Sequence, residues 1–164
     1  MLQTDYTRGT KDSDILETTQ VTDEIKAQLC ALAGFGTALH RQHRIYVDIV
    51  PTGLPFLPQV PRCHQLSTIN TTLNNFELEV LDIVDVVVSK LKRFTANDVS
   101  DIEAMVLRDL VPHEALVNRF KSAVDYYEMD ARAQELPRYI ENLHSVERDL
   151  FDMPETDIDV PAWL

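Results

Sequence analysis

The stretch Arg44-Ile45-Tyr46-Val47-Asp48-Ile49-Val50 (residues 44–50) carries the clearest secondary-structure pattern in this chain. Its aliphatic residues alternate with Tyr46 and Asp48, and a period of two predicts a half-buried strand. Aspartate is disfavoured inside strands, so Asp48 needs a partner or a purpose. Its carboxylate could pair with a lysine or arginine, face solvent, or bind a ligand.

A second short extended segment lies upstream, at residues 10–16, and contains the pair Asp12 and Asp14. Residues two apart on a strand face the same side, so both carboxylates could bind one divalent cation. The spacing alone is weak, because acid-x-acid pairs recur along the chain and also occur in solvated turns. If this segment and residues 44–50 are neighbours in a sheet, Asp12, Asp14 and Asp48 converge on one face. Three carboxylates suit Mg²⁺.

Helical patterns follow these strands. Thr22 is a suitable N-cap for a helix over residues 22–32. Its apolar face contains Val21, Ile25, Leu29 and Leu32, and Cys30 is expected to be a small core residue. Gly34 can end this helix, and the polar residues 40–44 indicate a loop. Further helices are predicted at residues 83–94, 97–110, 112–127 and 136–151, with Pro137 in the first turn of the last one.

These elements predict an α/β (α+β) fold. We expect a small mixed sheet with flanking helices in residues 1–82, with Phe76, Leu78 and Val80 in a further strand. A helical region follows at 83–151, and an acidic tail at 152–164 is expected to be extended, poorly ordered or docked on a partner. The proline-rich residues 51–61 are predicted to be an irregular connection. Trp163 is a candidate anchor for the tail.

Composition limits the function classes. The chain has 164 residues, of which 45% are hydrophobic, and 27 acidic against 15 basic residues give a net charge of −12. Such acidity argues against non-specific binding of duplex DNA. No apolar run approaches the ~20 residues that span a bilayer, and residues 1–12 lack the apolar core of a signal peptide. Two cysteines without a CxxC spacing indicate a reducing compartment. We therefore expect a cytoplasmic protein that does not bind membranes.

Cationic residues that could bind phosphates lie near the end of the predicted helix 83–94. Lys90 follows an apolar stretch, and its long side chain could reach from a buried helix into a pocket. Cations near a helix C-terminus, such as Arg93, also complement the helix dipole. Asp98 and Asp101 lie near the start of the next predicted helix, where acidic residues complement the opposite end of the helix dipole. Composition does not decide between the two explanations.

Three segments resemble motifs of the nucleotidyltransferase fold, in the branch of the AbiEii-type abortive-infection toxins and related uncharacterised bacterial nucleotidyltransferases. Residues 8–16, Arg8-Gly9-Thr10-Lys11-Asp12-Ser13-Asp14-Ile15-Leu16, resemble the RxTxDxD motif. Residues 46–50 resemble the strand with the third aspartate, and residues 89–102 resemble the KLxRxxxxDxxDI signature. Together, in this order, the three motifs are specific.

The resemblance implies an activity and a set of site residues. The activity is transfer of a nucleoside monophosphate from an NTP to an acceptor, which could be a protein, an RNA or a small molecule. The implied metal ligands for Mg²⁺ or Mn²⁺ are Asp12, Asp14 and Asp48, and Asp48 also helps to activate the attacking oxygen. The implied nucleotide contacts are Arg8, Thr10, Lys90 and Arg93. Asp98 and Asp101 are implied as catalytic or structural acids.

One family feature has no counterpart in the sequence. The superfamily carries a Gly-Gly or Gly-Ser turn upstream of the paired aspartates, and residues 1–7 contain no glycine. The turn Gly34-Phe35-Gly36 cannot replace it, because it follows the aspartates and ends a helix. Either the natural chain starts further upstream, or the phosphate-binding loop has been lost. The alternative function is therefore a non-catalytic interaction protein of the same fold, for example a toxin–antitoxin component. The apolar faces of the predicted helices could also form the surface of a homodimer.

Overall fold

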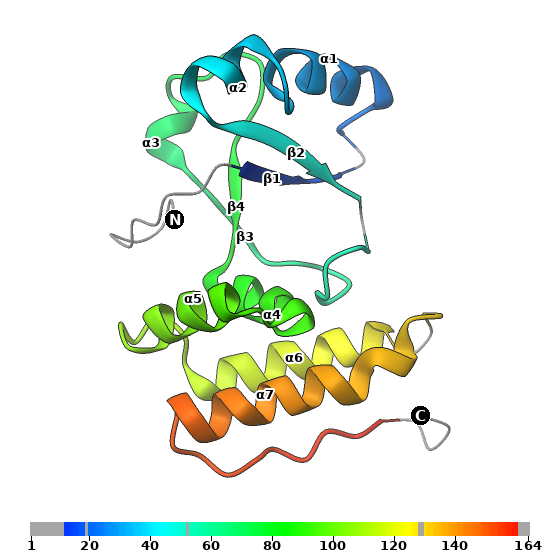
Figure 1. Cartoon of the computed structure of the whole chain (residues 1–164), viewed down its shortest axis with the longest axis vertical. Helices are drawn as coiled ribbons and strands as arrows, with labels where there is room; N and C mark the ends of the chain where they lie inside the picture. Colours follow the sequence, from blue (N-terminus) through cyan, green and yellow to red (C-terminus); the bar gives the residue numbers. More distant parts are fainter. Residues whose placement is uncertain (1–11, 19, 52, 128–129, 161–164) are drawn as a thin grey trace. The chain divides into compact units, whose positions relative to one another are not determined.

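The structure is a computed structural model that describes residues 12–18, 20–51, 53–127 and 130–160 (Figure 1). The described residues form two compact units, residues 12–55 and residues 56–160. The division after residue 82, which the change from predicted strands to predicted helices suggests, stays a prediction. The mixture of small sheets and helices confirms the predicted α+β class. Among the described residues, the helices are too short or too polar to cross a membrane.

The first unit is built on two parallel strands, β1 (Asp12–Leu16) and β2 (Tyr46–Val50). Both strands are confirmed, and their pairing places Asp12 opposite Tyr46 and Asp14 opposite Asp48. The connection contains α1 (Asp23–Ala33) and α2 (Ala38–His43). Parallel strands require such a crossover, since a tight hairpin can join only antiparallel strands.

Helix α1 begins as the sequence predicts, because the Thr22 hydroxyl accepts a hydrogen bond from the Ile25 amide. It ends at Gly34, where a Cβ would lie 2.4 Å from the Cys30 carbonyl oxygen. Its apolar face is buried only in part: Val21 and Leu29 are half-buried, whereas Ile25, Cys30 and Leu32 are exposed, so the expected core position of Cys30 is wrong. A two-stranded sheet offers little surface to cover a helix. The polar loop predicted at residues 40–44 is also wrong, because most of it belongs to α2, which Thr37 caps.

The second unit starts with an antiparallel pair, β3 (Cys63–Gln65) and β4 (Glu79–Leu81), separated by α3 (Ser67–Asn70). The helices that follow are α4 (Ile83–Arg93), α5 (Ala96–Val106), α6 (His113–Tyr127), the short 3₁₀ turn η1 (Ala133–Glu135) and α7 (Leu136–Leu150). They confirm the predicted helices with small shifts. The strand predicted from Phe76 starts later, and the Phe76 side chain is exposed.

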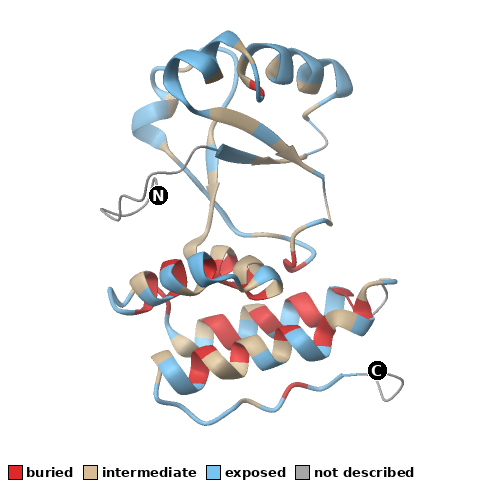
Figure 2. Cartoon of the chain, viewed as in Figure 1, coloured by how far each residue is buried: buried red, intermediate tan, exposed pale blue. Residues whose placement is uncertain are grey.

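The hydrophobic core of the second unit lies among its long helices. Helix α4 packs against α5, α6 and α7, and Figure 2 shows their facing sides as buried. The fully buried residues of this core include Val87, Leu91, Phe120, Tyr139 and Leu143. Since burial of one such side chain contributes about 1.5–3 kcal/mol, this core dominates the stability of the unit.

Phe56 comes from the proline-rich segment and lies completely buried in that core. Its ring centroid is 5.3 Å from that of Phe120 and 5.0 Å from those of Tyr127 and Tyr139. The segment has no helix or strand among its described residues, as predicted. The composition of this segment does not indicate that Phe56 enters the core, because the prolines exclude regular secondary structure but do not determine which side chains are buried.

The C-terminal segment contacts the helices of the second unit through Thr156 and Ile158. Ile158 is 8% exposed and belongs to the hydrophobic core. The Thr156 amide donates a hydrogen bond of 2.9 Å to the buried Glu147 carboxylate, and the Thr156 hydroxyl donates another of 2.5 Å. Residues 152–160 contain no helix or strand, which agrees with the extended alternative of the prediction. Trp163 lies outside the described residues.

Candidate functional site

The first candidate site is the carboxylate face, which consists of Asp12 and Asp14 on β1 and Asp48 on β2. The register places Asp14 directly opposite Asp48, and Asp12 lies two residues before Asp14. Side chains two apart on a strand, and those of directly paired residues, lie on the same side of a sheet. All three residues are exposed. The pairing therefore brings the predicted metal ligands to one side of one sheet.

The carboxylate face has the donor type of a magnesium site but is not a closed metal site. The Asp48 Oδ1 atom accepts a hydrogen bond of 3.0 Å from the Ile49 amide. Within residues 12–160, as far as the structure describes them, no three His, Cys, Asp or Glu side chains lie close enough together to hold a metal ion. Arg8 and Thr10, the nucleotide contacts expected from the first motif, lie outside the described residues.

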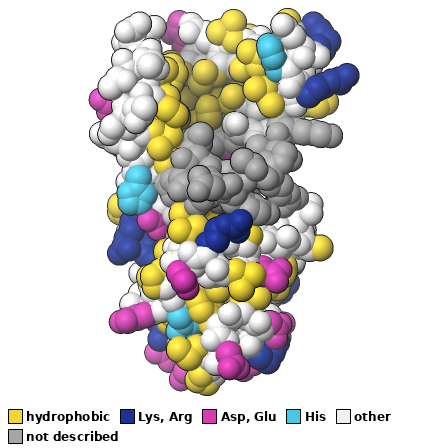
Figure 3. Space-filling model, turned by 90° about the vertical axis from the view of Figure 1, so that its left-hand side faces the viewer, with side chains coloured by type: hydrophobic (Ala, Val, Ile, Leu, Met, Phe, Trp, Pro, Cys, Tyr) yellow, Lys and Arg dark blue, Asp and Glu magenta, His cyan; other side chains and the backbone are white. Residues whose placement is uncertain are grey.

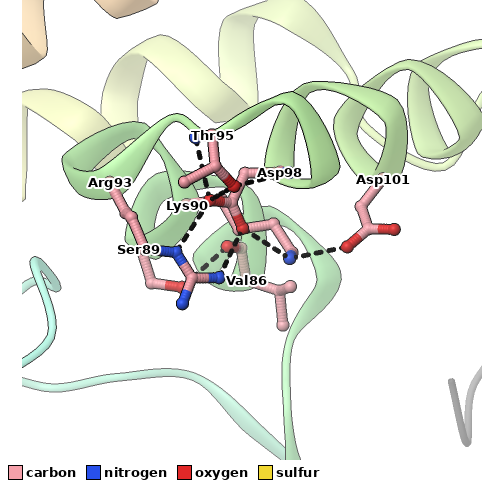
Figure 4. A network of polar contacts seen from close by, with 7 residues as sticks. All are labelled: Val86, Ser89, Lys90, Arg93, Thr95, Asp98 and Asp101. Carbon is pink, nitrogen blue, oxygen red and sulfur yellow. Dashed lines mark hydrogen bonds and ion pairs between the residues drawn. The ribbon is translucent and has the colours of Figure 1, made fainter. Parts of the chain in front are cut away.

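The second candidate site is the α4–α5 clasp, formed by Lys90, Arg93, Thr95, Asp98 and Asp101 (Figure 4). The Lys90 ammonium donates to Asp101 at 2.8 Å and to Asp98 at 3.2 Å. The Arg93 guanidinium binds Asp98 through two nitrogens, at 2.9 Å and 2.8 Å. The residues of the third motif therefore contact one another within the second unit.

Local sequence explains how the clasp forms. Helix α4 ends at Phe94, which adopts a left-handed conformation with φ of 48°. Thr95 then caps α5: its hydroxyl accepts from the Asp98 amide, while the Asp98 carboxylate accepts from the Thr95 amide. This reciprocal arrangement is a capping box. The predicted helix start at Asn97 is therefore wrong by one residue, and Thr95 is the cap.

The clasp holds Asp98 as a buried, ionised carboxylate. Asp98 is 1% exposed. The Arg93 guanidinium lowers its pKa far below the ordinary value, with further hydrogen bonds from Thr95 and Lys90, and these outweigh the opposing effect of burial. A carboxylate with so low a pKa is a poor general base near neutral pH. The Arg93 side chain is 71% exposed, so Asp98 positions a cation that remains open to solvent.

Comparison with known proteins assigns the family. The family model described as "Nucleotidyltransferase of unknown function (DUF6036)" matches residues 1–154. The chain belongs to this family. No match was found among curated proteins or among solved structures. The predicted nucleotidyltransferase resemblance is thus confirmed at the level of the family, and the AbiEii branch stays a prediction.

The nucleotidyltransferase-like chain also contains buried ionic contacts that sequence analysis missed. Arg119 on α6 donates to both oxygens of the fully buried Asp85 on α4, at 2.6 Å each. Hydrogen bonding to Asp85 raises the pKa of Arg119 above its ordinary value. The Arg62 amide donates to the same carboxylate at 2.7 Å. Partners separated by 34 or 23 positions leave no local sequence pattern, so only the fold reveals these contacts.

Proposed function

We propose that this protein transfers a nucleoside monophosphate from an NTP to an acceptor hydroxyl, with Mg²⁺ or Mn²⁺ held at the carboxylate face. One observation carries the proposal: Asp14 and Asp48 are directly opposite each other in a parallel strand pair, with Asp12 on the same side. The match to a nucleotidyltransferase family over residues 1–154 supports it. The acceptor would be a protein, an RNA or a small molecule.

Electrostatics supports a cation at this face. Neighbouring strands lie about 4.8 Å apart, and like charges at opposite positions destabilise paired strands. A divalent cation between Asp14 and Asp48 would offset this repulsion. Carboxylate oxygens are also the protein ligands that Mg²⁺ prefers, and it retains coordination positions for substrate phosphates.

The chain's own residues would share the remaining work. When bound, the metal ion would supply neutralisation of the phosphate charge that develops during transfer. Asp48 is our candidate for accepting the proton of the attacking hydroxyl. Its Oδ1 atom accepts from the Ile49 amide, and its Oδ2 atom has no hydrogen-bond partner within the described parts of the chain.

The phosphate contacts proposed for the NTP are Arg8, Thr10, Lys90 and Arg93. Arg93 belongs to the second unit; its side chain is 71% exposed, and arginine is a residue type that binds phosphate. Asp98 and Asp101 would then act by positioning Arg93 and Lys90. In this proposal Asp98 and Asp101 have a structural role and do not themselves transfer a proton.

Calorimetric titration with a non-hydrolysable NTP analogue and Mg²⁺ or Mn²⁺ tests the proposal. The wild type should bind the analogue only with metal present, and Asp14→Asn and Asp48→Asn should each weaken binding at least tenfold. Glu24→Gln, which changes an exposed acid on α1, is the matched control and should bind normally. Equal binding by the wild type and both aspartate variants contradicts the proposal. No binding by the wild type also contradicts it and favours the non-catalytic interaction protein.

A further inference from the structure

The first unit contains an exposed aromatic cluster, formed by Phe35, His40 and Tyr46. The ring centroids of Phe35 and His40 are 4.5 Å apart, and each lies 5.3 Å from the centroid of Tyr46. Phe35 is nevertheless 76% exposed, and hydrophobic side chains reach the protein surface in Figure 3. Three rings in mutual contact, with one largely open to solvent, differ from a scattered surface phenylalanine.

The turn that carries Phe35 is fixed on both sides. Gly34 approaches the Cys30 carbonyl so closely that no side chain fits, and Gly36 has a φ of 82°, which favours glycine. The Gly36 amide donates to the His40 Nδ1 atom at 3.0 Å. The Arg41 guanidinium donates to the Gly36 carbonyl at 2.9 Å. These contacts fix the backbone on both sides of Phe35.

The aromatic cluster adjoins the carboxylate face. Tyr46 is the strand partner of Asp12 and lies two positions before Asp48. By the alternation of strand side chains, it is on the same side of the sheet as both aspartates, about 7 Å from Asp48 along the strand. A ribose separates the base of a nucleotide from its α-phosphate by a distance of the same order.

We propose that the aromatic cluster binds the base of the NTP, which stacks on the exposed ring of Phe35. This rests on the function proposed above, since the phosphates must lie at the carboxylate face. Every base presents a flat π-surface, so stacking of this kind tolerates all four bases. The His40 Nδ1 atom accepts a hydrogen bond, so the neutral ring carries its proton on Nε2. That N–H can donate to an acceptor atom on the base edge.

The experiment compares a ligand with a base and a ligand without one. Non-hydrolysable ATP and CTP analogues and inorganic tripolyphosphate are titrated with Mg²⁺ into the wild type and into Phe35→Ala, Phe35→Trp and Leu32→Ala. Leu32 is the matched control, because it is an apolar residue of the same unit with 72% exposure and lies outside the aromatic cluster. Circular dichroism spectra establish that each variant is folded.

We expect Phe35→Ala to weaken binding of both nucleotide analogues about tenfold, and to leave tripolyphosphate binding unchanged. Phe35→Trp should restore nucleotide binding, and Leu32→Ala should behave as the wild type. Unchanged nucleotide binding by Phe35→Ala, with metal-dependent binding intact, overturns the base site and leaves the proposed function standing. If the wild type binds neither nucleotide nor tripolyphosphate, the proposed function and the base site both fail.

Discussion

Asp48 in the first unit and Asp98 in the second both belong to motifs found in the sequence, yet their surroundings are opposite. Asp48 is exposed and directly faces a second aspartate across the strand pair. Asp98 is buried and is bound by two cations and a helix cap. In the first unit two like charges occupy opposite strand positions, an arrangement that by itself disfavours strand pairing. The contacts in the second unit stabilise the fold, because each charge has a partner.

The same contrast holds for apolar residues. Among the described residues 12–55, Gly34 alone is buried, whereas residues 56–160 contain the whole hydrophobic core. This difference indicates that the second unit provides most of the folding stability and that the first unit carries the proposed binding residues. Substitutions in the second unit should lower the free energy of unfolding, and those in the first should change ligand binding. The following predictions test this division, beginning with the largest effect.

Phe56→Ala should lower the free energy of unfolding by about 3–5 kcal/mol, because it removes a buried aromatic ring that contacts three others. Phe35→Ala, the same substitution in the first unit, should change it by less than about 0.5 kcal/mol. Urea unfolding followed by circular dichroism measures both. Similar losses of unfolding free energy in the two variants would contradict the conclusion that the second unit provides most of the stability.

Asp85→Ala should cost about 3 kcal/mol of unfolding free energy, because it leaves the Arg119 guanidinium, 11% exposed, without its charged partner. Asp149→Ala is the control, since Asp149 pairs with Arg148 on the surface and both side chains are more than half exposed. Its cost should remain below about 1 kcal/mol. A small effect of Asp85→Ala would mean that the buried ion pair does not stabilise the second unit.

Asp98→Asn should destabilise the protein by about 2 kcal/mol at pH 7, because the neutral amide loses charged contacts with Arg93 and Lys90. The folded-state pKa of Asp98 is lowered from 3.8. Its stabilising contribution is therefore complete above pH 4 and is lost as the pH falls further. Urea midpoints at pH 7, 4 and 2 should show a difference between wild type and variant that narrows only below pH 4, because the folded-state pKa lies far below 3.8. A constant difference across this range would contradict the electrostatic explanation.

Asp48→Asn should raise the free energy of unfolding slightly, by about 0.5 kcal/mol, because it removes the repulsion from Asp14. The variant should also lose metal-dependent nucleotide binding, which would be a trade-off between stability and function. Thermal unfolding in chelator-treated buffer isolates the stability effect from any bound metal. A clear loss of stability would show that Asp48 is a structural residue like Asp98.

The predicted elements that the structure confirms depend on local patterns. The alternation at residues 44–50, the N-cap Thr22 and the first-turn Pro137 appear directly in the sequence, and β2, α1 and α7 follow from them. The predictions that failed concern burial. Cys30 and Leu32 lie on an apolar helix face but are exposed, because burial depends on how much surface other elements provide.

The sequence by itself identified the aspartates of the three motifs and the family of the chain, since short-range spacing and residue type carry that information. Tertiary structure alone decided that Asp14 faces Asp48, that Asp85 meets Arg119, and that Phe56 enters the core while Phe35 stays outside. Each of these outcomes depends on residues distant in the sequence. Contacts of that kind form only when the chain folds, and no local pattern encodes them.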